Sequence, residues 1–424
     1  MDFEIGYGNT VQRFSFPDKN LAGVLVPNPV EMGPKGEAAV EAALDAPIGA
    51  PRLEELVKPG QKVAVITSDI TRPMPSAQVL PSVLGRLDKA GISRSDITIV
   101  FALGSHRRHT RDEMAHLVGE AVMRDYSCVD SSEGEFIHLG FTGGGTPVDI
   151  AGVVAKADFR IALGNIEYHY FAGYSGGAKA VMPGCSTYDA IQVNHRRMVE
   201  ASAHAGKLEG NPVREDIEET MRYCPLHYIV NVVLDEHKKI IKCFAGDWKE
   251  AHRAGCRFLD MLYKTYITEP ADIVVVSQGG APKDLNLYQT QKALDNSKHA
   301  VREGGVIILV GSCKEGFGNK VFEEWMRQAR SPQELVDRIQ ADFRLGGHKA
   351  AAIALVEQKA DVYLVSDMAP DTVRDIFMTP FPTVQEALDT AFARMGADAR
   401  VLVMPYGGST LPVRDAQGVP NLGV

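Results

Sequence analysis

The hydrophobic residues of this chain gather into short runs that are rich in β-branched side chains and that end at glycine, proline or polar residues. Runs of this kind predict buried strands. Stretches with the helical spacing of apolar positions lie between them, and this alternation predicts an α/β fold with largely parallel, doubly wound sheets. The predicted strands cover residues 62–67, 96–102, 159–163, 272–277, 306–310, 362–365 and 401–404.

The same pattern predicts two domains. A short linker at 266–270 ends in proline and separates two sets of strands. Near the start of the chain, 14–17 and 22–27 predict an antiparallel hairpin. The expected parts are an N-terminal domain at 1–268, a C-terminal α/β domain at 269–404 and a glycine-rich tail at 405–424 that returns toward the first domain.

Polar side chains follow three of the predicted strands. Asp69 and Arg72 come after the first strand, in a segment where Pro73 and Pro75 exclude an immediate helix. His106 follows the second strand, and a further histidine, His169, follows the third. The carboxyl ends of parallel strands meet at one edge of a sheet, so these groups are expected to lie together. Each histidine taken singly is also compatible with a surface position or a helix cap.

The segment 164–195 concentrates reactive groups. Its glycine-rich turn lets backbone amides approach an anion, and Lys179 can then reach a phosphate or form a covalent adduct with a carbonyl-type cofactor. His195 can act as an acid, a base or a metal ligand. The nucleotide P-loop pattern does not fit, because Ala180 replaces the hydroxyl residue that must follow the lysine. A tight turn with an exposed lysine is the alternative interpretation.

A fourth cluster follows the strand at 272–277. Asp284 is expected to cap the next helix. On that helix Tyr288 and Lys292 share a face, with Gln289 beside them. A hydroxyl, an amide and an ammonium group together suit a carboxylate, and an ordinary amphipathic helix is the alternative.

Composition narrows the class of protein. The net charge of −9 argues against a nucleic-acid partner. The six cysteines form no C-x-x-C pair, which is typical of reduced thiols in a cytoplasm. The chain contains no apolar run long enough to span a membrane and begins without an apolar leader. A cytoplasmic enzyme without membrane partners is expected.

Four motifs together resemble the lactate racemase family in order and spacing. They are SDITRP, ALGSHR, IEYHYFAGYSGGAKAVMPG followed by NH, and QGGAPKDLNLYQTQK. The resemblance covers essentially the whole chain. It implies a nickel-pincer-nucleotide-dependent racemase or epimerase of 2-hydroxy acids, which removes and returns a hydride through a 2-keto acid intermediate, with the active site in the interdomain cleft.

The resemblance also implies residue roles. Lys179 would carry the pyridinium-3,5-bisthiocarboxylic acid mononucleotide of nickel as a thioamide, placed there by cofactor-synthesis enzymes, and His195 would bind the nickel. His106 and His169 would be the catalytic acid and base. The remaining implied residues are Asp69, Gly173, Ser175, Gly176 and Gly177 around the cofactor, and Arg72, Tyr288, Gln289 and Lys292 at the substrate.

One departure from the family pattern concerns the substrate. Lactate-specific members carry a tryptophan near the substrate, and neither Trp248 nor Trp325 matches it. The corresponding segment, 342–349, offers Arg344, His348 and Lys349 instead, either at the pocket or facing solvent. A larger or more acidic substrate than lactate, such as malate or an aldonate, is therefore expected.

Two other classes of function remain open at this point. An NAD(P)-dependent 2-hydroxy acid dehydrogenase would use similar side chains, but the chain lacks a dinucleotide fingerprint. A non-catalytic protein that binds nickel or a sugar acid is the other alternative.

Overall fold

The computed structural model describes residues 1–30, 33–235 and 237–415. The chain divides into a central unit, residues 30–260, and a terminal unit, made of residues 1–29 and the chain from 261 onward. Residues 1–29 belong to the same unit as the C-terminal part of the chain. Residues 416–424 of the predicted tail lie outside the described residues.

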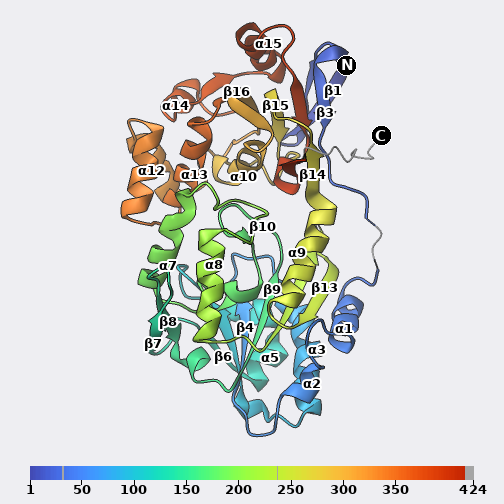
Figure 1. The fold of residues 1–424 in the computed structure, drawn as a ribbon, viewed down its shortest axis with the longest axis vertical. Coiled ribbons are helices and arrows are strands. Elements are labelled where there is room, and N and C mark those ends of the chain that lie inside the picture. Colours follow the sequence, from blue (N-terminus) through green and yellow to red (C-terminus); the bar gives the residue numbers. More distant parts are fainter. Residues whose placement is uncertain (31–32, 236, 416–424) are drawn as a thin grey trace. The chain divides into compact units, whose positions relative to one another are not determined.

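The central unit is built on a six-stranded sheet in the order β13-β12-β9-β4-β5-β6 (Figure 1). β12 and β13 are antiparallel, and the other neighbouring strands are parallel. The three strands predicted in this region are confirmed. The strands are β4 (Val63–Ser68), β5 (Ile97–Ala102), β6 (Ser127–Asp130), β9 (Phe159–Asn165), β12 (Tyr228–Leu234) and β13 (Ile240–Gly246).

Helices and two small hairpins complete the central unit. Alternate residues of the central strands, such as Val65, Ile99 and Ile161, enter one hydrophobic core and are fully buried. The hairpins are β7 (Phe136–Phe141) with β8 (Pro147–Ala151) and β10 (Tyr168–His169) with β11 (Gly173–Tyr174). The helices are α1 (Glu37–Asp45), α2 (Leu53–Leu56), α3 (Ser76–Lys89), α4 (Arg111–Val118), α5 (Glu120–Asp125), α6 (Gly152–Ala155), α7 (Tyr188–His195), α8 (Pro212–Glu219) and α9 (Glu250–Tyr263), which continues into the terminal unit.

The terminal unit contains a second six-stranded sheet, in the order β18-β17-β16-β15-β19-β3, and all its neighbouring strands are parallel (Figure 1). β3 comes from the N-terminal segment and pairs with β19, which explains why residues 1–29 belong to this unit. The strands are β3 (Leu21–Val24), β15 (Ala271–Ser277), β16 (Val301–Val310), β17 (Asp361–Val365), β18 (Thr379–Phe381) and β19 (Val401–Met404).

The N-terminal hairpin was predicted in the wrong place. The antiparallel pair is β1 (Asp2–Tyr7) with β2 (Thr10–Ser15), whereas the apolar run after it forms the parallel edge strand β3. In the tail, β20 (Leu411–Arg414) pairs with β14 (Lys264–Ile267) in the same unit. The helices of this unit are α10 (Leu287–Ser297), α11 (Lys320–Gln328), α12 (Pro332–Ala341), α13 (Gly347–Glu357), α14 (Pro370–Arg374) and α15 (Val384–Met395).

Each sheet has one point at which the strand order reverses. In the central unit the chain moves outward from β4 through β5 to β6 and then returns to place β9 on the other side of β4. In the terminal unit β15 and β19 flank the equivalent point. Loops diverge above the carboxyl ends of the strands at such a switch point, and open α/β sheets bind their ligands there.

The buried face of β5 provides a test of the core of the central unit. Ile99 is fully buried in it, so Ile99→Ala should lower the free energy of unfolding by about 2–5 kcal/mol, because the lost methyl groups leave a cavity. Ile99→Val removes one methylene and should cost about 0.5–1.5 kcal/mol. Chemical denaturation of both variants measures the two values, and equal losses would contradict the packing described.

Candidate active site

The loop after β4 places Asp69 beside a histidine. Asp69 is buried, and its Oδ1 accepts hydrogen bonds from the Thr71 amide (2.7 Å) and the Thr71 hydroxyl (2.5 Å). Its Oδ2 accepts a hydrogen bond from Nδ1 of His106, which follows β5. Burial acts to raise the pKa of Asp69, but the bond and charge of His106 and the bonds from Thr71 outweigh it and hold the pKa below its usual value.

This pairing decides how His106 can act. A carboxylate that accepts from Nδ1 fixes that nitrogen as a donor and leaves Nε2 as the nitrogen that can exchange a proton. Asp69 therefore works on His106 through a direct hydrogen bond, and both of its oxygens are engaged within the protein. Asp69 and His106, which follow β4 and β5, thus lie in direct contact.

His169 follows β9 and has a different environment. It lies in the short hairpin β10–β11, opposite Gly173. Its ring stacks on Tyr170 and meets Phe171 edge-on at 4.5 Å between centroids, and a long hydrogen bond of 3.3 Å from the Ala172 amide orients it. Burial, followed by neighbouring positive charges, holds the pKa of His169 well below its usual range. The ring is therefore neutral near pH 7.

The glycine-rich turn owes its shape to close packing. Gly176 and Gly177 have φ values of 76° and 58°, in the left-handed region that favours glycine. A Cβ atom at Gly173 would lie 2.0 Å from the carbonyl oxygen of Lys207, and one at Gly177 would lie 2.9 Å from the ring of His252. Larger residues at these positions would push the turn away from the Lys207 backbone and from α9.

Two amides of this turn are engaged within the protein. The Ser175 amide donates to the Glu167 carbonyl (2.9 Å), and the Gly177 amide donates to Oδ1 of Asn231 (2.8 Å). The Ser175 hydroxyl likewise donates to the Asn165 carbonyl at 2.6 Å. The amides of Ser175 and Gly177 thus fix the position of the turn, and they are not aimed at an anion.

Lys179 leaves this turn at the start of a short 3-10 helix, Gly177–Ala180. Burial, then the charges of Arg214 and Arg72, hold the pKa of its amine well below the usual range. Its Nζ lies 5.8 Å from the centroid of the Phe171 ring. A neutral amine is the form of lysine that can act as a nucleophile.

His195, at the end of α7, is held by a chain of buried polar groups. Asn194 donates through Nδ2 to Oδ2 of Asp216 (2.7 Å) and to the Val213 carbonyl (3.2 Å). Its Oδ1 must therefore be the acceptor of the 2.8 Å contact with Nδ1 of His195. This contact places the ring proton on Nδ1 and the lone pair on Nε2, which is the form in which a histidine binds a metal.

Several residues that hold the site carry no signal in the sequence. Arg214 is fully buried and donates to the carbonyls of Ala172 (3.0 Å) and Tyr174. Asn211, the N-cap of α8, donates to the Phe171 carbonyl at 2.9 Å. The pair Asn211-Pro212 predicts the start of a helix, but only the fold reveals that this helix start clamps the segment after His169.

In the terminal unit, Tyr288, Gln289 and Lys292 lie on the first turns of α10, as expected. The cap of this helix is Asn286, whose Oδ1 accepts from the Gln289 amide at 3.1 Å. The prediction of Asp284 as the cap is wrong, because its Oδ2 instead accepts from the amides of Gly8 (2.7 Å) and Ser312 (3.0 Å). Asp284 thus anchors the N-terminal segment.

Of the three basic residues in the segment 342–349, Lys349 contacts a predicted site residue. Its Nζ lies 4.1 Å from the centroid of the Tyr288 ring and donates to the Tyr288 carbonyl at 2.6 Å. Arg344 is largely exposed and pairs with Asp342 at 2.9 Å. His348 is buried and accepts the Gly346 amide at Nδ1.

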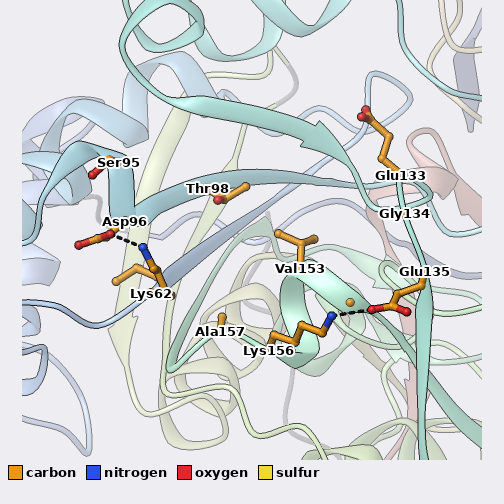
Figure 2. Close-up of a pocket in the computed structure, with 12 residues that line it drawn as sticks. Lys62, Ser95, Asp96, Thr98, Glu133, Gly134, Glu135, Val153, Lys156 and Ala157 are labelled. Atoms are coloured by element: carbon orange, nitrogen blue, oxygen red, sulfur yellow. Dashed lines mark hydrogen bonds and ion pairs between the residues drawn. The ribbon is translucent and has the colours of Figure 1, made fainter.

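A separate hollow of about 470 Å³ opens where β4 and β5 begin (Figure 2). Two ion pairs line it, Lys62 with Asp96 and Lys156 with Glu135, each at 2.5 Å. Its lining residues include none of the predicted site residues, and Asp69, Arg72 and His106 follow the opposite ends of these two strands. Its size alone does not make it the reaction site.

Three further findings concern metal ions, membranes and the cysteines. Within residues 1–30, 33–235 and 237–415, no group of three or more His, Cys, Asp or Glu side chains is arranged to hold a metal ion. None of the helices in the described part of the chain combines the length and the apolar character needed to cross a membrane. The six cysteines are free thiols, as expected.

Two known family domains and two known proteins match this chain over almost its whole length. The lactate racemase N-terminal domain matches residues 7–206, and the lactate racemase C-terminal domain matches residues 267–411. A lactate racemase from Thermoanaerobacterium thermosaccharolyticum is 34% identical over 422 residues, which cover 97% of this chain and 99% of that protein. A lactate racemase from Lactiplantibacillus plantarum is 35% identical over 402 residues, 92% of this chain and 94% of its own length.

Solved structures agree with this match. The lactate racemase apoprotein from Thermoanaerobacterium thermosaccharolyticum has a TM-score of 0.86 at 33% identity and covers 97% of this chain and 100% of its own. A Thermotoga maritima protein with 18% identity has a TM-score of 0.62, covers 91% of this chain and 100% of its own, and shares the fold. The predicted α/β class is confirmed.

Proposed function

The chain belongs to the lactate racemase family, and we propose that it is a racemase or epimerase of 2-hydroxy acids whose substrate is larger or more acidic than lactate. Its membership of this family makes it an isomerase. The observation that carries the proposal is the pair of histidines after the two neighbours of β4, one beside a carboxylate and the other among cations. We also propose a cytoplasmic location, which suits the free thiols.

Racemisation of a 2-hydroxy acid must break the C–H bond at Cα. Removing that hydrogen as a proton is difficult, because no adjacent ketone or thioester acidifies it. Removing it as a hydride, together with the hydroxyl proton, gives a planar 2-keto acid that can take the hydride back on either face. A nickel pincer nucleotide bound at Lys179 would supply the hydride acceptor.

The chain has residues that suit this cofactor. Lys179 offers a neutral amine, which the thioamide linkage needs. His195 holds its proton on Nδ1, so its Nε2 lone pair suits a nickel ion. The nickel ion would need a single protein ligand, because the cofactor itself would provide the others. Gly173, Ser175, Gly176 and Gly177 would border the cofactor as the turn from which Lys179 projects.

The two histidines would divide the proton transfers. His169 is kept neutral and is suited to take the hydroxyl proton of one stereoisomer once the long 3.3 Å bond from the Ala172 amide no longer occupies its unprotonated Nδ1. His106, with Asp69 at its Nδ1, is suited to hold a proton on Nε2 and to donate it to the oxygen of the other stereoisomer. Opposite environments of two titratable groups are a common basis for such a division. In the reverse direction the two roles are exchanged.

The substrate carboxylate needs cations and donors. Arg72 can pair with it through two parallel hydrogen bonds. Tyr288, Gln289 and Lys292 on α10 would complete its recognition. Lys349, which stacks on Tyr288, adds a cation that would favour a second carboxylate or a polyhydroxylated chain, as in malate or an aldonate.

The covalent tether can be tested by mass. Protein produced together with the cofactor-synthesis enzymes should carry an adduct that Lys179→Arg lacks, because a guanidinium remains protonated and is a poor nucleophile. Racemase activity should disappear with the adduct. Lys207→Arg, which changes a lysine next to the same turn, is the matched control and should keep both. Full activity in Lys179→Arg would refute the tether.

The metal ligand can be tested by elemental analysis. His195→Ala should keep the adduct on Lys179 but lose most of the nickel, because the side chain that supplies the protein ligand is gone. Asn194→Leu should weaken nickel binding by about 10–100-fold, because the tautomer of His195 is then no longer fixed. Unchanged nickel content in His195→Ala would make this residue a core histidine.

The division of proton transfer predicts equal need for both histidines. Each turnover in either direction uses both rings, so His106→Ala and His169→Ala should each lower kcat by at least about 10²-fold for both stereoisomers. Gln289→Ala, which removes only a substrate contact, should raise KM more than it lowers kcat. Polarimetry measures these rates, and near-normal kcat in either histidine variant contradicts the scheme.

The substrate class can be tested with single stereoisomers of lactate, malate and aldonates. We expect a higher kcat/KM for malate or an aldonate than for lactate. Lys349→Met should lower kcat/KM for the preferred acid by about 10–100-fold and leave that for lactate nearly unchanged. Arg344→Met is the control, because Arg344 is exposed and paired with Asp342. A clear preference of the unaltered protein for lactate would refute the substrate assignment.

A further inference from the structure

The segment after β5 carries a second histidine, His109, three residues after His106. Together the two rings contact three consecutive residues of the loop after β4. His106 meets Asp69 and the hydroxyl of Thr71 (3.2 Å), and His109 accepts the Ile70 amide at Nε2 (3.0 Å). The segment after β5 thus holds the loop that ends in Arg72.

His109 is in turn held by a buried carboxylate. Its Nδ1 lies 2.6 Å from Oδ1 of Asp130, at the end of β6, and its own amide donates to the other oxygen of Asp130 at 2.9 Å. Both side chains are only 1% exposed. The ring also packs on Phe101, with centroids 5.2 Å apart.

These contacts leave one arrangement of protons for the ring. The Ile70 amide can only donate, so Nε2 of His109 must be unprotonated. The remaining proton lies on Nδ1 and is donated to Asp130. This ring is therefore an acceptor toward the site loop and a donor toward the core, and its Nε2 is engaged by the loop itself.

The backbone around His109 is anchored independently. Arg108 donates to the Ser132 carbonyl at 2.7 Å, and Arg107 pairs with Glu113 at 2.6 Å. Thr110 and Glu113 form the reciprocal cap that starts α4. A rigid segment can transmit position, and a side chain that projects from it can fix a neighbouring loop.

We propose that His109, oriented by Asp130, is a positioning residue of the reaction: it fixes the Ile70 amide and thereby sets where Asp69 meets His106 and where Arg72 meets the substrate carboxylate. This role rests on the proposed function for its consequence in catalysis. Its structural part, the hold on the loop, can be measured without activity.

Two substitutions test the contacts of the two ring nitrogens of His109 separately. His109→Gln places an amide oxygen near the former Nε2 and can keep the bond to Ile70 while losing Asp130. His109→Asn places an amide nitrogen near the former Nδ1 and can keep Asp130 while losing Ile70. His109→Phe keeps the ring packing and loses both contacts. His227→Phe is the matched control, because His227 also accepts a backbone amide (Arg160, 3.0 Å) and stacks on a phenylalanine, but precedes β12.

The first readout is hydrogen exchange in the full-length, cofactor-free protein. A peptide that contains Ile70 should exchange about 2–10-fold faster in His109→Phe and His109→Asn than in the unaltered protein, which corresponds to one lost hydrogen bond. His109→Gln and His227→Phe should leave it nearly unchanged. Equal exchange in all four variants would overturn the proposal, whatever the activity of the enzyme.

The second readout is kinetics of the cofactor-loaded enzyme. His109→Phe and His109→Asn should lower kcat and raise KM together, by roughly 10²-fold in kcat/KM, and His109→Gln should restore most of the loss. His109→Phe should also add little to Asp69→Asn, because both act on the same ring of His106. If the only role of His109 were its contact with Asp130, His109→Asn would be more active than His109→Gln. A higher activity of His109→Asn would therefore refute the positioning role. Absence of racemase activity in the unaltered enzyme would instead refute the proposed function and leave the exchange result standing.

Discussion

The buried guanidinium of Arg214 supports the whole region around Lys179. The chain between His169 and Lys179 is irregular yet buried, so its carbonyl groups need donors inside the protein. Arg214 supplies them to Ala172 and Tyr174. Its Nη1 lies 3.9 Å from a carboxylate oxygen of Glu218, and its positive charge also acts on Lys179. Burial and this charge lower the pKa of Lys179. One side chain thus sets both the shape and the electrostatics.

The order of the strands explains why groups from separate segments share one region. β4 lies between β5 and β9, so the loops that follow these three strands leave the same edge of the sheet side by side. The loop after β4 gives Asp69 to His106, while the hairpin after β9 keeps His169 among cations. Two residues of the same type therefore have different surroundings. A difference of this kind would suit the proposed transfer of a proton in both directions.

In the terminal unit, the start of α13 shows how packing places a cation beside α10. Trp325 is buried under this helix start, and a Cβ atom at Gly347 would lie 2.6 Å from its ring. The indole thus packs within the unit and supports the turn from which Lys349 reaches Tyr288. A cation stands beside the predicted substrate residues, and its position depends on packing several residues away in the sequence.

The sequence by itself determined the α/β class and the central strands of both six-stranded sheets, because hydrophobic runs and the glycine and proline residues that bound them act locally. It did not predict the edge strands β6, β13 and β18 or the strand β12. It misplaced the N-terminal hairpin and the cap of α10, where β3 joins a sheet strand almost 380 residues away and Asp284 binds the amide of Gly8. The roles of Arg214, Asn231, His252 and His109 were decided by tertiary structure alone. Each meets the hydrogen-bonding needs of a backbone that is distant in the sequence, and no local pattern encodes which carbonyl or amide will be buried next to it.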